Sequence, residues 1–358
     1  MKEALVLAIN PGSTSTKIAV FEGTSPLFIQ TLRHSAEELK TFSAVTDQFG
    51  FRKQMIMQEI ENSDVNFSDI HIVMGRGGLL KPVVSGVFAV NERMIEDLRS
   101  CKYGEHASNL GGLIADDIAR SLPDAKAYIA NPVVVDEMSE MAKLSGHPLL
   151  PRRSIFHALN QKAVAREHAR QILKKYEDLN LIVVHLGGGI TVGAHQKGKV
   201  IDVNQGLDGD GPYSPERSGT LPVGDLVRLC YSGKYELSEV LKMITGKGGL
   251  VAYLGTNSAQ EVEQMTAEGN TFAELIYDGM AYQVSKEVGA MAAVLRFDID
   301  GIIITGGIAH DKYFVNRIIS HIHRLAPVHV YPGEDEMKAL AMNGMRILNG
   351  ETEALVYS

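Results

Sequence analysis

The chain has 358 residues, of which 45% are hydrophobic, and a mean hydropathy of -0.02, so it can bury a large core and its length favours about two domains. Its formal net charge is -8 and its basic residues are scattered, which argues against nucleic acid as a partner. Two cysteines without metal-ligand spacing indicate a reducing compartment, and the first apolar run, 4–9, is too short for a secretory signal or a membrane span. We therefore expect a cytoplasmic protein without a membrane partner.

Apolar and alternating runs in the first half predict strands, and helical periodicity between them predicts helices. In chain order, these are strands at 4–10, 16–22 and 26–32, a helix at 35–61, a strand at 70–75, helices at 91–100 and 108–121, and a strand at 125–131. The first three strands form a meander, because short polar turns separate them. This order is typical of a sheet covered by helices.

A similar order recurs in the second half. It comprises strands at 181–187, 190–196 and 199–204, further helices including a long one at 272–297, a strand at 301–307, another helix, a strand at 328–333 and a final helix from Glu334 onward. A helix at 154–175 separates the halves, and Ser154 is predicted as its N-cap, which places His157 in the first turn. The repetition predicts a duplicated α/β fold. It resembles the actin-like ATPase superfamily, whose domains are ribonuclease H-like, and this resemblance implies an interdomain nucleotide cleft.

Three glycine-bearing turns follow apolar runs, at 10–17, 185–191 and 304–311. Glycine lets backbone N–H groups approach a phosphate closely, so the three turns together could bind one nucleotide. The first turn is not a P-loop, because it lacks a second glycine before Lys17, Ile18 follows the lysine, and it joins two strands. Taken singly, each turn could also be a polar hairpin, a bulge or a plain strand-to-helix connection.

Several charged side chains are candidates for chemistry. Arg217, in a long loop, and Arg76, in a glycine-rich strand end, could hold a carboxylate or a phosphoryl group bidentately. His157 follows paired arginines, Asp136 follows an apolar run, and Glu336 could contribute to a magnesium site. Each also has a structural alternative: a solvated arginine, a structural histidine, or an acid that caps a helix or is favoured by the helix dipole.

Seven segments, taken in order, resemble the acetate and butyrate kinase family along nearly the whole chain. They are Asn10 to Lys17, Arg76 to Gly78, Arg152 to His157, His185 to Gly189, Arg217 to Gly219, Thr305 to Ile308 and Glu334 to Glu336. GRGGLL, YGEHASNLGG and NPVVVDEM resemble the butyrate kinases more than the acetate kinases. The resemblance implies reversible, Mg²⁺-dependent phosphoryl transfer between ATP and the carboxylate of butyrate, in a dimer or larger homo-oligomer.

The resemblance also implies roles for the matched residues. The catalytic residues would be Arg76, Asp136, His157 and Arg217. Of these, the arginines would hold the acyl carboxylate and the histidine would donate to the transferring phosphoryl group. Asn10 and Glu336 would help to hold Mg²⁺. The nucleotide and its phosphates would be bound by Gly12, Ser13, Thr14, Lys17, His185, Gly187, Gly188, Gly189, Gly306, Gly307 and Ile308.

By the same resemblance, residues 1–153, completed by a helix at 340–358, form the domain on the acyl-substrate side, and 154–339 form the nucleotide-binding domain. Gly75 and Phe156 are expected to line the acyl pocket. The chain departs from acetate kinases near 258–260, where their Asp-Phe-Arg run is missing, and after Ile308. Three alternatives remain open: a kinase for acetate, propionate or isobutyrate, a sugar kinase with Asp136 as its base, and a non-catalytic nucleotide switch.

Overall fold

The computed structural model describes residues 4–358, which form two compact units. The first unit comprises residues 4–135 together with Asp335–Ser358, and the second comprises Asp136–Glu334. Residues 136–153 and 335–339 therefore group differently from the predicted domains, whose functional assignment stays a prediction. None of the helices in the described part of the chain is long and apolar enough to cross a membrane.

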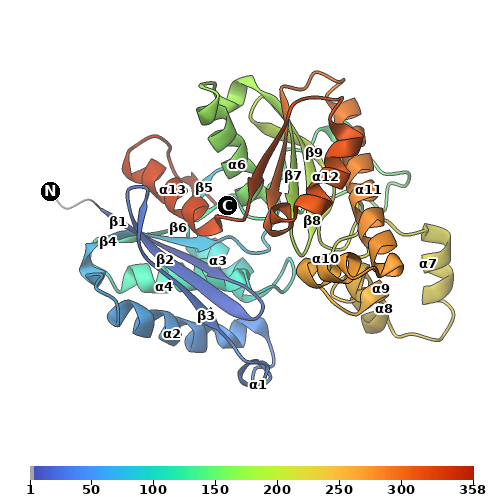
Figure 1. The fold of residues 1–358 in the computed structure, drawn as a ribbon. Helices are drawn as coiled ribbons and strands as arrows, with labels where there is room; N and C mark the ends of the chain where they lie inside the picture. The colour runs from blue at the N-terminus through green and yellow to red at the C-terminus, as the bar shows by residue number, and fades with distance from the viewer. Residues whose placement is uncertain (1–3) are drawn as a thin grey trace. The chain divides into compact units, whose positions relative to one another are not determined.

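A mixed sheet forms the centre of the first unit (Figure 1). In sheet order its strands are β12 (Leu355–Val356), β5 (Val87–Ala89), β6 (Lys126–Ala130), β4 (Ile70–Arg76), β1 (Leu5–Pro11), β2 (Ser15–Glu22) and β3 (Ser25–Arg33). Strands β1, β2 and β3 form the predicted antiparallel meander. Strands β4 and β6 continue in parallel from β1, and β1 is buried at every position, as expected for a strand covered on both faces.

Helices pack on both faces of this sheet. Helix α4 (Asn109–Arg120) contacts β4 and β6. Its buried side chains belong to a hydrophobic core cluster that also includes Leu7 and Val73. Helix α13 (Glu336–Leu348) covers the alternate side chains, since its Gly344 lies against Val6 and Met74. The remaining helices of the unit are α1 (Ala36–Leu39), α2 (Phe49–Glu61) and α3 (Glu92–Arg99), with 3-10 turns at Val45–Gln48 and Phe67–Asp69.

The second unit has its own sheet and its own helix layers. In sheet order its strands are β11 (Val328–Pro332), β10 (Gly301–Gly306), β7 (Asn180–Leu186), β8 (Ile190–Gln196) and β9 (Lys199–Val203). Ile182 and Val184 pack with α11 (Thr271–Val294), whereas Leu181 and Val183 pack with α6 (Ala158–Gln171), because side chains alternate along a strand. The other helices are α5 (Glu140–Lys143), α7 (Val223–Cys230), α8 (Leu237–Ile244), α9 (Gly249–Leu254), α10 (Ala259–Ala267) and α12 (Lys312–Ile322), with 3-10 turns at Tyr176–Asp178 and Gly307–His310.

The two sheets share one topology. The order β3-β2-β1-β4-β6 in the first sheet has its counterpart in β9-β8-β7-β10-β11, with the same parallel and antiparallel pairings. This repetition confirms the predicted duplicated α/β fold. Strands β5 and β12 were not predicted, because two or three residues are too few to show a period.

Three helix predictions are wrong. The helix predicted at 340–358 ends at Leu348, and the chain beyond it forms the short strand β12 instead. The single helix at 35–61 is interrupted after α1, where the Thr41 hydroxyl donates to the Glu38 carbonyl at 2.7 Å and closes a local turn. Helix α6 begins at Ala158 with His157 as its N-cap residue, so Ser154 is not the cap. The chain before α6 stays non-helical because the Ile155 carbonyl accepts a hydrogen bond from Gly206 N–H at 2.8 Å.

Candidate active-site groups

The first glycine turn joins β1 to β2. It is closed by a hydrogen bond from Gly12 N–H to the Ser15 carbonyl at 2.7 Å. Ser13 and Thr14 are exposed at its tip, and Lys17 is exposed on β2. Hydroxyls, backbone amides and an ammonium group on one hairpin are donors that suit a phosphate group.

A buried arginine that the sequence did not single out holds this turn from within the unit. Arg52, on α2, is 1% exposed. Its guanidinium donates to the carbonyls of Gly12, Ser13 and Ser15 at 2.8, 3.2 and 3.1 Å. Burial lowers the pKa of Arg52 to about 10, so the group keeps its charge at neutral pH. The backbone of the first turn is therefore held by hydrogen bonds from a buried positive charge.

Arg52 belongs to a buried polar cluster. It also donates to Thr16 Oγ1 at 3.0 Å and to Gln48 Oε1 at 2.8 and 3.0 Å. Thr16 Oγ1 lies 2.9 Å from His34 Nε2. Burial, and secondly the charge of Arg52, lowers the pKa of His34 to about 4, so this ring is neutral at pH 7. The sequence did hold one sign that Arg52 is buried. Arg52 lies four residues before Ile56, on the face of α2 that is buried.

Three predicted site residues meet in the first unit, although they are far apart in sequence. Arg76 Nη1, at the end of β4, donates to Asn10 Oδ1 at 3.1 Å and to Glu336 Oε2 at 3.0 Å. Asn10 Nδ2 donates to the same carboxylate oxygen at 2.5 Å. Asn10 and Glu336 are buried, and Glu336 is the first residue of α13, whose N-cap is Asp335. The two predicted Mg²⁺ ligands are therefore adjacent.

The chemistry of Asn10 and Glu336 is compatible with a Mg²⁺ ion, and their role as its ligands stays a prediction. Both offer hard oxygen atoms, and protein-bound Mg²⁺ is commonly held by one or two carboxylates together with substrate phosphates. Within residues 4–358, no group of three or more His, Cys, Asp or Glu side chains could hold a metal ion.

Gly75 has a packing role that the sequence did not reveal. A β-carbon at this position would overlap the Gly111 carbonyl and lie 2.9 Å from Gly112 N. Gly111 in turn faces the backbone of Arg76, with a hypothetical β-carbon 2.9 Å from Arg76 N. Paired glycines thus let β4 and α4 approach closely. The role of Gly75 in an acyl pocket stays a prediction.

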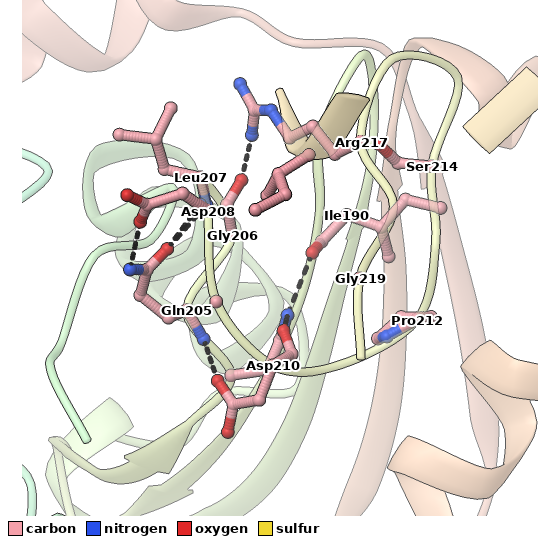
Figure 2. A pocket seen from close by; sticks show the side chains of 13 residues that line it. Ile190, Gln205, Gly206, Leu207, Asp208, Asp210, Pro212, Ser214, Arg217 and Gly219 are labelled. Carbon is pink, nitrogen blue, oxygen red and sulfur yellow. Dashed lines mark hydrogen bonds between the residues drawn. The ribbon is translucent and has the colours of Figure 1, made fainter. Parts of the chain in front are cut away.

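The second glycine turn follows β7 and lies against Arg217. This arginine comes from the long loop between β9 and α7, and its Nη1 donates to the Gly206 carbonyl (Figure 2). A β-carbon at Gly189 would overlap the guanidinium, so the two groups are in direct contact. On the same loop, Ser214 Oγ donates to the Gly188 carbonyl at 2.7 Å. The turn therefore has a cation beside its backbone, as a phosphate or carboxylate would require.

The long loop is ordered by its own hydrogen bonds. Residues of 204–219, together with Ile190 and Ile244, line a pocket (Figure 2). Asp210 Oδ1 accepts from Gln205 N–H at 2.8 Å, and Gln205 Oε1 accepts from Asp208 N–H at 2.7 Å. These local contacts shape the backbone that carries Arg217.

The two predicted histidines stack on each other beside this turn. The ring centroids of His157 and His185 are 3.8 Å apart and the planes differ by 12°. His185 is 1% exposed, with Nδ1 2.8 Å from Asn160 Oδ1 and Nε2 3.3 Å from Glu334 Oε1. His157 Nδ1 lies 3.0 Å from Thr191 Oγ1. His157, which is predicted to donate a hydrogen bond to the transferring phosphoryl group, and His185, which is predicted to face the phosphates, are thus neighbours.

Asp136 and Arg152, the first of the paired arginines, have structural partners. Asp136 Oδ2 lies 3.2 Å from Lys143 Nζ, and its Oδ1 accepts from a backbone N–H at 3.1 Å. Arg152 forms ion pairs with Asp202 at 2.8 Å and Asp210 at 2.9 Å. For Arg152, the contacts indicate a role in holding the segment before α6.

The third glycine turn follows β10. Gly306 has a φ of 99°, and it exchanges backbone hydrogen bonds with Gly333 at 3.1 and 2.9 Å. A β-carbon at Gly306 would overlap the backbone of Leu186, so the turn requires glycine. Ile308 is 8% exposed and Phe156 is 2% exposed. Their roles toward adenosine and the acyl group stay predictions.

Comparison with known proteins shows which protein family the chain resembles. A model of the acetokinase family matches residues 143–348. Butyrate kinase 2 of Clostridium acetobutylicum is 55% identical over 352 residues, which cover 98% of this chain and 99% of that protein. Butyrate kinase 1 of the same organism is 53% identical over 352 residues, with the same coverage.

Solved structures show the same fold at much lower identity. Porphyromonas gingivalis acetate kinase has a TM-score of 0.79 and 19% identity, covering 96% of this chain and 100% of its own. A propionate kinase from Francisella tularensis has a TM-score of 0.74 and 19% identity, covering 95% and 98%. The predicted fold class is thereby confirmed. Because the family model spans more than half of the chain and both clostridial relatives match nearly all of it, the chain belongs to the acetokinase family.

Proposed function

We propose that the chain is a butyrate kinase, which transfers a phosphoryl group reversibly between ATP and the carboxylate of butyrate. The observation that carries this proposal is the 55% identity over 98% of the chain to butyrate kinase 2 of Clostridium acetobutylicum. Acetate, propionate or isobutyrate could serve as alternative acceptors, because one methylene group changes binding in an apolar pocket by only about 1 to 3 kcal/mol.

A carboxylate acceptor determines what the site must do chemically. The acid is already ionised at neutral pH, so no general base is needed, and the enzyme must instead bring two anions together. Arg76 and Arg217 would hold the acyl carboxylate and neutralise its charge. His157 would donate to an equatorial phosphoryl oxygen during in-line transfer. Positioning and electrostatics would account for most of the rate.

Asn10 and Glu336 would hold Mg²⁺ on the nucleotide. The ion would supply positive charge to the phosphate oxygens. The contacts of Arg76 with both ligands keep its guanidinium beside them. The other proposed phosphate contacts are Gly12, Ser13, Thr14, Lys17, His185, Gly187, Gly188 and Gly189, the proposed adenosine contacts are Gly306, Gly307 and Ile308, and the proposed acyl contacts are Gly75 and Phe156.

The partners of Asp136 favour a carboxylate acceptor over an alcohol. A sugar kinase would need this carboxylate as a free base, but its oxygens are engaged by Lys143 and by a backbone N–H. We propose that Asp136 instead stands beside the acyl site among its catalytic residues, oriented by these two contacts. We also propose that the protein is cytoplasmic and forms a homo-oligomer.

Trapping with hydroxylamine tests the proposal, because an acyl phosphate gives a coloured hydroxamate. The full chain is incubated with ATP, Mg²⁺ and straight or branched acids of two to six carbons, with glycerol and glucose as alcohol controls. We expect acid-dependent hydroxamate with the highest kcat/KM near four carbons. Failure with every short acid would refute the proposal, and slow ATP hydrolysis independent of acid would favour a nucleotide switch.

A further inference from the structure

A chain of hydrogen bonds runs from His157 into the interior of the second unit. His157 Nδ1 lies 3.0 Å from Thr191 Oγ1, which lies 2.8 Å from Gln161 Nε2. Gln161 Oε1 lies 2.9 Å from His195 Nε2, and His195 Nδ1 lies 2.7 Å from the Tyr176 hydroxyl. Thr191, Gln161 and His195 are 0% exposed, so water does not compete for these groups.

The inner half of the chain has a defined direction. Gln161 Nε2 also donates to the Thr191 carbonyl at 3.1 Å, and a carbonyl can only accept, so Oε1 must face His195. Burial, and secondly the charges of Lys162 and Arg166, holds the pKa of His195 well below its usual value, so the ring carries one proton. That proton lies on Nε2, because Gln161 Oε1 needs a donor.

The hydrogen bond between Tyr176 and His195 fits the same direction of donation. His195 Nδ1 must accept, and the Tyr176 hydroxyl is the group that faces it. Burial raises the pKa of Tyr176, so the hydroxyl keeps its proton and can donate. Each donor from Tyr176 to Gln161 is therefore matched by an acceptor.

The same logic extends outward to the active-site histidine. Thr191 Oγ1 accepts from Gln161, so its single hydrogen remains to be donated. Among the residues that the structure describes, His157 Nδ1 is the other partner of this hydroxyl. If His157 Nδ1 carried a proton, the buried threonine hydrogen would have no acceptor in this network, which disfavours that arrangement by about 10- to 100-fold.

We infer that Thr191 and Gln161 are positioning residues that hold His157 as its Nε2–H tautomer, which makes Nε2 the hydrogen-bond donor of this ring. The purpose of this donor, contact with the transferring phosphoryl group, rests on the proposed function, whereas the tautomer does not. The stack on His185 disfavours charge on both rings at once, because two imidazolium rings with centroids 3.8 Å apart would repel.

The tautomer is measured directly by 15N NMR of the full chain labelled at histidine. The His157 signals are identified by their loss in His157→Gln. We expect a pyrrole-like Nε2 and a pyridine-like Nδ1 in the unmodified protein. A pyrrole-like Nδ1 would overturn the inference whether or not any acid is phosphorylated, so this readout is separate from the proposed function.

Variants of Thr191 test its part in the network. Thr191→Val removes the hydroxyl at nearly constant volume and should give a mixture of His157 tautomers, whereas Thr191→Ser keeps the hydroxyl and should restore the single form. With butyrate, Thr191→Val should lower kcat about 10- to 100-fold and leave both KM values within about threefold. Unchanged His157 signals in Thr191→Val would contradict the inference.

A matched control separates positioning from general loss of structure. Thr266 Oγ1, on α10, is buried without a partner among the described residues, so Thr266→Val removes a hydroxyl outside the network. It should leave kcat and the His157 signals unchanged. If Thr191→Val does not fold, the unmodified protein, Thr191→Ser and Gln161→Leu decide the question, since Gln161→Leu also removes the donor that orients Thr191.

Discussion

Replacing Arg52 by methionine tests whether the first glycine turn depends on its buried guanidinium. Methionine keeps most of the aliphatic length and removes every donor. The Gly12, Ser13 and Ser15 carbonyls then lose the hydrogen bonds at 2.8, 3.2 and 3.1 Å, and Thr16 Oγ1 loses one at 3.0 Å. The turn would lose its connection to α2.

The expected loss follows from the number of these bonds and their exposure. A hydrogen bond from a charged donor contributes about 1.5 to 3 kcal/mol. Ser13 is exposed, so its carbonyl can turn to water, and removing a buried cation recovers part of its desolvation cost. We therefore expect Arg52→Met to lower the free energy of unfolding by about 2 to 4 kcal/mol.

Urea unfolding of the full chain is the assay. It is followed by far-UV circular dichroism for the whole protein and by hydrogen exchange of the β1–β2 peptides for the turn. Arg33→Met is the matched control, because Arg33 is exposed on β3 and its replacement should change stability by less than about 0.5 kcal/mol. Arg52→Lys should fall between the two. A loss below about 1 kcal/mol, with unchanged exchange at the turn, would refute the reasoning.

Three further predictions concern single positions. Arg217→Ala should lower kcat for acyl phosphate formation by roughly two powers of ten or more, whereas Arg228→Ala, an exposed arginine paired with Asp225, should be near normal in the same hydroxamate assay. Gly75→Ala should destabilise the protein by about 2 kcal/mol or more in thermal unfolding, because the added carbon meets α4 backbone, while Gly50→Ala has nothing within 4 Å and should be neutral or stabilising. Burial, and secondly Asp210, raises the pKa of Glu287 to about 7, so the folded state binds the extra proton and stability falls as pH rises from about 4.5 to about 7. In urea unfolding, Glu287→Gln should therefore raise the free energy of unfolding by about 1 to 2 kcal/mol at pH 8, a figure that is reduced for the partial exposure of the side chain. Near pH 4.5 the substitution should leave the free energy of unfolding unchanged, and equal gains at both pH values would contradict this reasoning.

Periodicity along the chain was sufficient to predict most strands and the duplication. The runs at 190–196 and 70–75 gave β8 and nearly all of β4, because each is a continuous or alternating apolar segment bounded by polar turns. The same local rule failed at 35–61, where a threonine side chain closes α1, and at β5, which is too short to show a period. The local hydrophobic pattern therefore predicts the type of an element better than the residues at which the element begins and ends.

The glycine turns were predictable as backbone features, and the ordered family segments predicted the reaction class. Their detailed surroundings were not predictable. Arg52 reads as one more arginine in an amphipathic helix, yet it binds three carbonyls of a turn about forty positions earlier in the chain. Gly75 reads as room for a substrate, yet it faces Gly111. Which atoms surround a side chain depends on packing between distant segments.

The sequence by itself determined the fold class, the turns and the candidate residues, because these follow from local period, glycine chemistry and resemblance to a family. Only the tertiary structure decided that Asn10, Arg76 and Glu336 share hydrogen bonds, and that Thr191 and Gln161 stand behind His157. The physical reason is the cost of an unpaired buried polar group. Each such group must find a partner in space, and folding brings that partner from a part of the chain that no local pattern specifies.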